Sequence, residues 1–374
     1  MLSGQNHEPR VSRGRRAGIV VGHATARWRP LLLTVLLASC ASTGGASPAG
    51  SVKPATSSSA TPSVAVPSAT ADVRLAMTSV EPTAVIEVPG ASGTIAVATD
   101  GTTVWAAGDG AILRIDAATN SVERLPAPTL SGDTTMAIAD DGLWVTSWAG
   151  SHLYRLDPQT GEVLLSVDTP SPVRITFLGD DLWVGSEGKK TMTLVDRKTG
   201  RLGRSMDAGT YGTAGLGDLW FPADRTTTIE RVDPASGEIK ATIEGQGEDN
   251  CDITGEFPDN VWLSCFGRDV RSRSATRIDP ATNSVAAVAT VPPSHGGSLA
   301  IIDGEPWFVG LFEDDAGNPT GGLLRMDPAT GAIDRFVSIG PADPNPPVVA
   351  AGAIWVPDEA GHRLLRVNVA DLSD

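Results

Sequence analysis

Several polar and aromatic residues fall in segments that the sequence predicts to be loops, where they could contact one ligand together. These residues are basic between positions 189 and 273 and mainly acidic between 313 and 362. One interpretation is a polar or charged ligand held between a basic and an acidic arc, and the other is ordinary solvated loops. The candidate ligand-binding residues are Trp148, Lys189, Lys190, Tyr211, Arg225, Arg268, Arg271, His295, Glu313, Asp314, Asp315, Glu359 and His362.

Trp148 and Tyr211 are the aromatic residues of this set, and they could contact a sugar or a peptide. Packing within the loop explains Trp148 equally well. His295 or His362 together with Glu359 could form a reactive site, although a single loop histidine is more often a hydrogen-bonding surface residue. No Gly-x-Ser-x-Gly, P-loop, Gly-x-Gly-x-x-Gly or paired-histidine zinc motif accompanies them. We therefore assign no catalytic residue, no metal ligand and no cofactor.

The charge balance restricts the kind of partner. The chain has 374 residues and a net charge of -15, and the first 39 residues hold six Arg and one Glu. The remainder is therefore more acidic still. Such a surface repels phosphate backbones and anionic lipid head groups, which argues against nucleic acid or a polybasic membrane contact. The remaining partners are a small molecule, a glycan or an envelope protein.

The N-terminal 39 residues predict an export signal. Arginines precede a short apolar run, residues 31–38, which is too short to span a bilayer. Because Cys40 follows Leu-Ala-Ser, the segment resembles a bacterial lipoprotein signal, and this resemblance implies lipidation of Cys40. An ordinary secretory signal is the alternative. Residues 40–72 are rich in Ser, Thr, Ala and Pro and predict a disordered tether.

The rest of the chain repeats. An aspartate turn recurs six times, and the residue four positions after the aspartate is always Gly or Asn. These two residues adopt positive φ most easily, so each copy predicts a tight hairpin whose aspartate caps backbone N–H groups. A tryptophan lies upstream of each turn, and a degenerate seventh copy ends the chain. The tryptophans that define the repeat are Trp105, Trp144, Trp183, Trp220, Trp262, Trp307 and Trp355.

Tryptophans spaced by about 40 residues are typical of propeller blades. Each repeat contains four strands, A to D, and the seventh lacks strand D. Residues 84–88 resemble a strand D and would complete that blade, which closes the ring. We therefore predict an all-β, seven-bladed propeller of four-stranded antiparallel blades over residues 73–374, with its core at 84–374.

These tryptophan strands and Asp-Pro-Ala-Thr-Gly turns resemble the bacterial propellers of the YVTN and streptogramin (virginiamycin B) lyase-like superfamily. The resemblance implies the fold strongly and the function weakly, because one scaffold hosts many functions. Streptogramin lyases use a His and a metal-binding Glu in a Trp-Phe-Thr-Glu pattern. No Glu matches that pattern here, and we carry over no catalytic residue.

Cys251 and Cys265 flank the predicted A-B turn of blade five. Antiparallel pairing about a turn near Pro258 aligns residues whose numbers sum to 516 or 517, which these two do. An exported protein folds in an oxidising compartment, so the sequence predicts a disulfide. Two free thiols or a redox pair are the alternatives.

These features favour an envelope lipoprotein, attached to the outer face of the membrane through Cys40, whose propeller is a non-enzymatic binding or protein-interaction module. The alternative is a metal-assisted lyase or lactone hydrolase that acts on a small molecule with a divalent cation.

Overall fold

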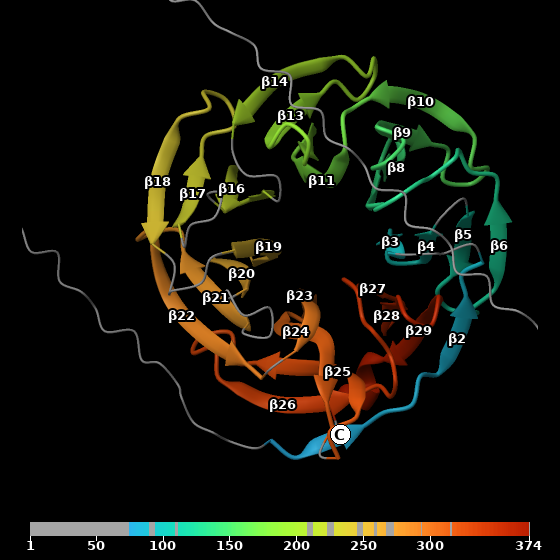
Figure 1. The fold of residues 1–374 in the computed structure, drawn as a ribbon, viewed down its shortest axis with the longest axis vertical. Coiled ribbons are helices and arrows are strands. Elements are labelled where there is room, and N and C mark those ends of the chain that lie inside the picture. Colours follow the sequence, from blue (N-terminus) through green and yellow to red (C-terminus); the bar gives the residue numbers. More distant parts are fainter. Residues whose placement is uncertain are drawn as a thin grey trace, which may run out of the picture. The chain divides into compact units, whose positions relative to one another are not determined.

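The computed structural model describes residues 75–89, 94–108, 111–207, 212–222, 228–244, 250–257, 260–266, 273–292, 294–314 and 316–373. Seven sheets are arranged around a common centre, as the sequence predicts (Figure 1). In the first six blades strands A to D follow chain order, and strand D lies on the outside of the ring. The predicted signal at 1–39, Cys40 and the tether at 40–72 lie outside the described residues.

Blades one to four consist of four antiparallel strands each. Their strands are β3 (Ala96–Thr99), β4 (Thr103–Gly108), β5 (Ala111–Asp116), β6 (Val122–Leu125), β7 (Met136–Ala139), β8 (Gly142–Ser147), β9 (His152–Leu156), β10 (Val163–Asp168), β11 (Pro172–Leu178), β12 (Asp181–Ser186), β13 (Thr191–Val195), β14 (Leu202–Asp207), β15 (Thr213–Gly215), β16 (Asp218–Pro222), β17 (Thr228–Val232) and β18 (Ile239–Glu244).

Blades five to seven complete the ring, and two strands from before blade one join them. The strands are β19 (Asn250–Phe257), β20 (Asn260–Phe266), β21 (Arg273–Asp279), β22 (Ser284–Val291), β23 (His295–Ile302), β24 (Glu305–Glu313), β25 (Pro319–Met326), β26 (Ile333–Ser338), β27 (Val348–Ala350), β28 (Ala353–Asp358), β29 (Arg363–Asn368), β1 (Met77–Ser79) and β2 (Ala84–Glu87).

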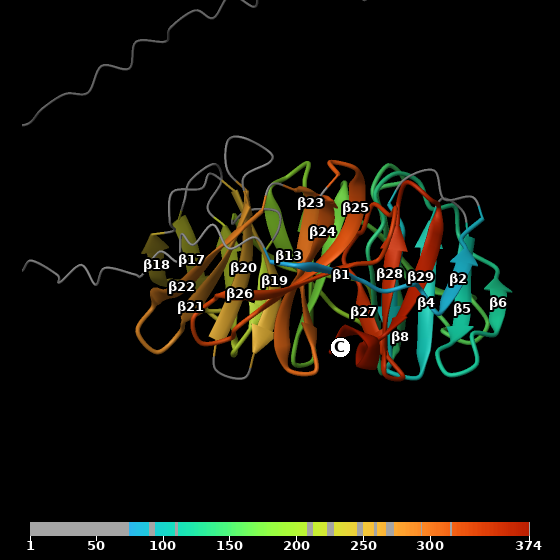
Figure 2. The same ribbon diagram turned by 90° about the horizontal axis from the view of Figure 1, so that it is seen from below.

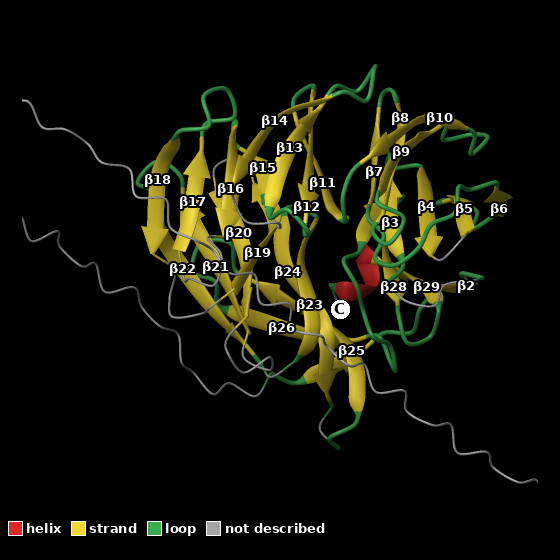
Figure 3. Cartoon of the chain, turned by 45° about the horizontal axis from the view of Figure 1, so that its top comes forward, coloured by secondary structure: helices red, strands yellow, loops and turns green. Residues whose placement is uncertain are grey.

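The chain between residues 75 and 373, where it is described, contains one short 3-10 helix, η1 (Val369–Leu372), and no α-helix (Figure 3). Consequently no described helix is long and apolar enough to cross a membrane.

The aspartate turns have the predicted conformation. In blade two Asp157 Oδ1 accepts the N–H groups of Gln159 and Thr160, both at 2.8 Å, and Gly161 N donates to the Asp157 carbonyl. The φ angle of Gly161 is 73°, and Asn120 reaches 62° at the same position of blade one. These hydrogen bonds hold the pKa of Asp157 below its ordinary value, so this carboxylate stays ionised and structural.

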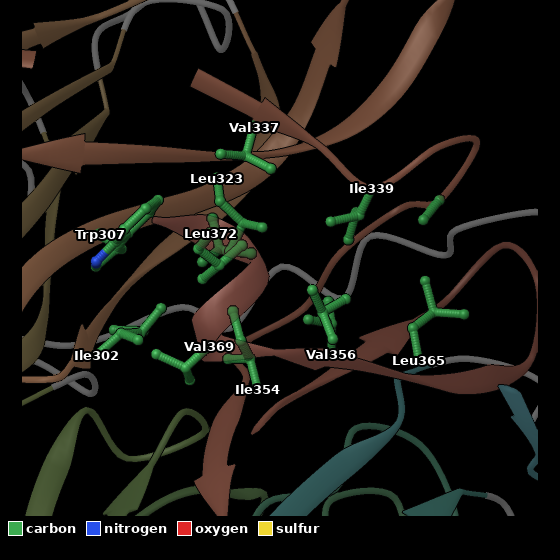
Figure 4. Close-up of a cluster of buried hydrophobic side chains, with 14 residues drawn as sticks. Ile302, Trp307, Leu323, Val337, Ile339, Ile354, Val356, Leu365, Val369 and Leu372 are labelled. Carbon is green, nitrogen blue, oxygen red and sulfur yellow. The ribbon is translucent and has the colours of Figure 1, made fainter. Parts of the chain in front are cut away.

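Tryptophans fill the spaces between blades, because each blade is wedge-shaped and a large ring closes the gap to its neighbour. Trp262 packs with Phe308 of the following blade and is completely buried. In Figure 4, side chains of blade six meet those of blade seven and η1 around Trp307, Val356 and Leu372. The seven repeat tryptophans are therefore core residues, as the sequence predicts.

Two N-terminal strands close the ring. β2 pairs antiparallel with β29 and is strand D of blade seven, as predicted. β1 was not predicted: it pairs parallel with β26 and makes blade six five-stranded. Figure 2 shows both strands on the outer wall of the ring. The N-terminal strap, residues 77–88, therefore covers the outer edges of two blades.

The cysteines of blade five lie opposite each other. The Cα partners in the β19–β20 ladder include Cys251 and Cys265, and the pairs sum to 516 before a β-bulge and to 517 after it. Cys251 is inside strand A rather than on the approach to it. The side chains of both cysteines lie outside the described residues.

An arginine two residues before the turn aspartate joins neighbouring blades, a role that its type and spacing alone do not reveal. In blade two Arg155 pairs across the strands with Trp144, and its guanidinium lies 5.7 Å from the centre of that ring. The same side chain donates to the carbonyl of Arg197 in the turn of blade three at 2.8 Å. In blades two and four the guanidinium thus binds its own blade by stacking and the next blade by a hydrogen bond, whereas Arg325 of blade six binds two carboxylates of its own blade.

Blade three lacks this arginine, and another arginine makes the equivalent contacts. Leu194 occupies the arginine position. Arg204 on β14 instead lies 5.8 Å from the centre of the Trp183 ring and donates to the carbonyl of Pro234 in the next turn. The inter-blade contact is therefore kept with a different residue.

Candidate functional site

The loops between strands B and C and those between strands D and A emerge at one end of the ring, which we call the B-C face. The aspartate turns and the A-B turns emerge at the other end, the turn face. This division follows from antiparallel strands, because consecutive turns of a blade alternate between its two ends. Most of the predicted ligand-binding residues belong to the B-C face.

Trp148 is the best-defined of these residues. It follows β8 in the B-C loop of blade two and is 36% exposed. Its Nε1 donates to Oε2 of Glu187 in the B-C loop of blade three, at 2.7 Å. A Cβ atom on Gly132 would lie 2.9 Å from Cε3 of the indole, so the ring packs against this glycine. The indole is thus held by a hydrogen bond at Nε1 and by packing at Cε3.

The backbone of this loop is also held. Trp148 N donates to the carbonyl of Asp133 at 3.2 Å, and Ala149 N donates to that of Ser131 at 2.9 Å. Ser131 N in turn donates to the buried Ser147 Oγ at 3.1 Å. The B-C loop of blade two and the D-A loop before β7 therefore form one hydrogen-bonded unit.

The predicted basic arc is described only in blade three. Lys189 and Lys190 are exposed in the same loop as Glu187, so they lie close to the carboxylate that binds Trp148. The other members of the basic and aromatic set lie outside the described residues: Tyr211, Arg225, Arg268 and Arg271.

The acidic residues of blade six mainly shape their own loop. Asp314 Oδ1 accepts the backbone N–H groups of Ala316 and Asn318 at 2.9 and 2.7 Å. The backbone and side-chain amides of Asn318 hold the pKa of Asp314 below its ordinary value. Glu313 is exposed at the end of β24, and Asp315 lies outside the described residues.

In blade seven the acidic residues are joined to the preceding D-A loop. Glu359 Oε2 accepts the Asn345 side-chain amide at 3.1 Å, and Glu359 accepts the N–H of the exposed His362 through its carbonyl oxygen at 3.2 Å. Asp358, which the loop pattern places on the acidic arc, is 1% exposed and binds Arg363 Nε at 2.7 Å. His295 is the first residue of β23, and its side chain lies outside the described residues.

The structure thus brings together Trp148 with Glu187, and Glu359 with Asn345. It separates the basic loop of blade three from the acidic loops of blades six and seven, which lie in different parts of the ring (Figure 1). Over the ranges that the structure describes, no group of three or more His, Cys, Asp or Glu side chains is placed to hold a metal ion.

A groove on the turn face, of about 590 Å³ between blades two and three, was not predicted. The sequence feature that marks it is Arg197-Lys198, which stands where the other five turns have Pro-Ala, Pro-Gln or Ala-Ala. Arg197 bridges to Asp140 and to Asp141. Burial would raise the pKa of Asp141, but hydrogen bonds from Arg197, Trp144 and Arg155 outweigh it and lower that pKa. These charged groups are paired with one another, as is typical of an ion-pair network that stabilises a structure.

Comparisons with known proteins agree with the fold. Residues 91–232 match the sequence model of a family described as outer membrane protein assembly factor BamB, and this match spans less than half of the chain. No curated protein matches the chain.

Three solved structures illustrate the likeness. Hydrazine synthase of Kuenenia stuttgartiensis is 14% identical, with a TM-score of 0.57 over 66% of this chain and 81% of that chain. A mitotic checkpoint complex structure is 12% identical, with a TM-score of 0.63 over 77% and 94%. The β-propeller domain of Cps50 (Swd1) from Myceliophteria thermophila is 10% identical, with a TM-score of 0.59 over 76% and 99%. At these identities the likeness establishes the fold alone.

Proposed function

We propose that this protein is a cell-envelope lipoprotein whose propeller is a non-enzymatic binding or protein-interaction module, with the B-C face as its binding surface. The BamB-like repeats over residues 91–232 support an envelope role, since that family is described as an outer membrane protein assembly factor. The turn motifs that resemble the YVTN and streptogramin lyase-like superfamily agree with the same scaffold.

The hydrogen bonds of the acidic loops of blades six and seven favour a binding function over a catalytic one. A general acid or base works best with a pKa near the working pH and a proton that it can exchange. Asp314 instead accepts backbone hydrogen bonds that lower its pKa, and Glu359 is engaged by Asn345. The lowered pKa keeps Asp314 ionised, and both side chains are held in place by hydrogen bonds, which suits recognition.

Photo-cross-linking tests this proposal with a matched pair of lysines from one blade. Lys189 is exposed on the B-C face and Lys198 is exposed on the turn face. A photoreactive residue at position 189, in the protein expressed in its own envelope, is expected to capture a partner that position 198 does not capture. Equal capture at the two positions, or capture at position 198 alone, would contradict a binding role for the B-C face. Cation-dependent turnover of a lactone would support the lyase instead.

Lipidation gives a second test. Changing Cys40 to Ala removes the only thiol that follows the predicted signal directly, so we expect the protein to leave the membrane fraction. The measurement is the mass of the mature protein together with its distribution between membrane and soluble fractions. A Ser47→Ala variant is the control, because it changes a residue of the predicted tether and leaves all three cysteines in place. A Cys40→Ala protein that remains membrane-bound with unchanged mass would show that the lipid anchor is wrongly assigned.

We also propose that Cys251 and Cys265 form a disulfide. Directly opposite residues of an antiparallel pair have Cα atoms about 4.5 or 5.5 Å apart, within the span that a disulfide needs. Reduction is expected to lower the free energy of unfolding by about 3 kcal/mol, as for a 15-residue loop. The measurement is alkylation and intact mass before and after reduction. Two thiols that react without reductant in the native protein would refute the bond.

A further inference from the structure

We infer that the indole of Trp148 is a stacking platform for a carbohydrate, with Glu187 fixing the orientation of the ring. This inference rests on the proposed binding function of the B-C face and specifies its ligand. The exposed large apolar residues on the described part of the chain include a single aromatic residue, Trp148. The other members of that group belong to strands β2, β6, β10, β14 and β18, which are outer strands of the blades.

The first argument is that the ring is preorganised. Nε1 is bound to Glu187 of the next blade, and Cε3 packs on Gly132, where a side chain would collide with it. An exposed tryptophan usually has several rotamers to lose on binding a ligand. Here the glycine and the carboxylate remove most of that freedom before any ligand arrives.

The second argument concerns which part of the indole remains for a ligand. The only polar atom of the ring, Nε1, is already satisfied by Glu187 at 2.7 Å. Trp148 is 36% exposed, and the part of the ring that remains for a ligand consists of carbon atoms. A ligand that uses this surface must present a flat apolar face of comparable size.

The third argument is the polar rim. Glu187, Lys189 and Lys190 are exposed in the loop next to the indole, and Asp133 is exposed in the loop beneath it. Among the described residues no other large apolar side chain is exposed in these loops, so an apolar peptide anchor would lack the contiguous patch that it needs. A pyranose ring has one small face of C–H groups and a rim of hydroxyl groups. It therefore matches an isolated indole whose neighbouring loop carries the exposed polar side chains of Glu187 and Lys189.

The experiment is a titration of the mature protein, from which the predicted signal and its Trp28 have been removed, with chitotriose, cellotriose and maltotriose, measured by calorimetry and by tryptophan fluorescence. The fluorescence signal is selective because the seven repeat tryptophans are at most 4% exposed. We expect at least one of these sugars to bind and to protect tryptophan from iodide quenching. Trp148→Ala should weaken this binding about tenfold or more, as expected for loss of a stacked ring.

Two variants separate stacking from folding. Trp148→Phe keeps an aromatic face without the Nε1 donor and should retain part of the affinity. Gly132→Ala changes none of the proposed contact residues but should displace the indole, because the added Cβ would lie 2.9 Å from Cε3 and the φ of 69° is unfavourable for Ala, and it should therefore weaken binding. The control is Val163→Ala, an exposed residue on the outer strand of the same blade.

Failure to bind any of the three sugars would overturn the inference, as would a sugar affinity that Trp148→Ala leaves unchanged. The proposed function is tested separately by cross-linking from position 189. A captured protein whose cross-link needs Trp148, in the absence of sugar binding, would reject the carbohydrate and leave the binding module intact. Sugar binding that is lost in Trp148→Ala but kept in Val163→Ala supports it.

Discussion

A protein that begins at Ser92 is expected to melt about 10 °C or more below one that begins at Val73, or to fail to fold. The shorter protein lacks β1, β2 and the buried Val88. Blade seven would then end at β29, with the backbone groups that pair with β2 unsatisfied. Val88 and Ile86 also pack in the core shared by blades seven and one, so their loss opens that interface. For a domain of this size, such a shift in melting temperature corresponds to a loss of several kcal/mol in the free energy of unfolding.

A third protein, beginning at Glu81, separates the two strands of the strap. It lacks β1 and Val80 but keeps β2, and β1 forms only three paired positions on the outside of blade six. We therefore expect a much smaller shift, of a few degrees, from differential scanning calorimetry. Equal melting temperatures for the proteins that begin at Ser92 and Val73 would mean that β2 does not close the ring in solution.

The difference between β2 and β1 shows what the sequence could predict. β2 was predictable because a repeating unit with a missing fourth strand demands a replacement, and residues 84–88 match the other fourth strands. The αL positions of the six aspartate turns were predictable for a similar reason, since only Gly and Asn fill them. Met77-Thr78-Ser79 carries no repeat, and its parallel pairing depends on an edge more than 250 residues away.

The same limit applies to the candidate site. Trp148 was identifiable as the tryptophan outside the repeat pattern, but Glu187 was not singled out. The two residues are one repeat apart, 39 positions, and each directly follows strand B of its blade. Corresponding positions of consecutive blades lie side by side, so comparing them across the repeat would have found the pair. The loops of blades four and five have variable sequences and lengths, and repeat matching does not position their side chains.

Replacement of Arg231 by Ala is expected to destabilise the propeller by about 3 kcal/mol, the usual cost of leaving a buried charge without its main partner. Arg231 Nε binds Asp218 at 2.5 Å, and its NH1 group donates to the carbonyl of Pro280 in blade five at 2.6 Å. Its guanidinium also stacks on Trp220 at 5.2 Å. Asp218 is 2% exposed, and without Arg231 its remaining ionic partner is Lys240 at 2.6 Å.

Chemical denaturation of four proteins measures this effect and assigns its cause: the native sequence, Arg231→Ala, Asp218→Asn and the double variant. Because removing the carboxylate charge also removes the unpaired ion, the double variant should lose less stability than the sum of the single variants. Arg231→Lys keeps the positive charge but loses the stacking on Trp220 and the several N–H donors of the guanidinium. Its stability should therefore lie between those of Arg231→Ala and the native protein. Additive effects would mean that Arg231 acts mainly through its contact with blade five. A loss below about 0.5 kcal/mol, the range of ordinary surface substitutions, would mean that the arginine does not join the blades in solution.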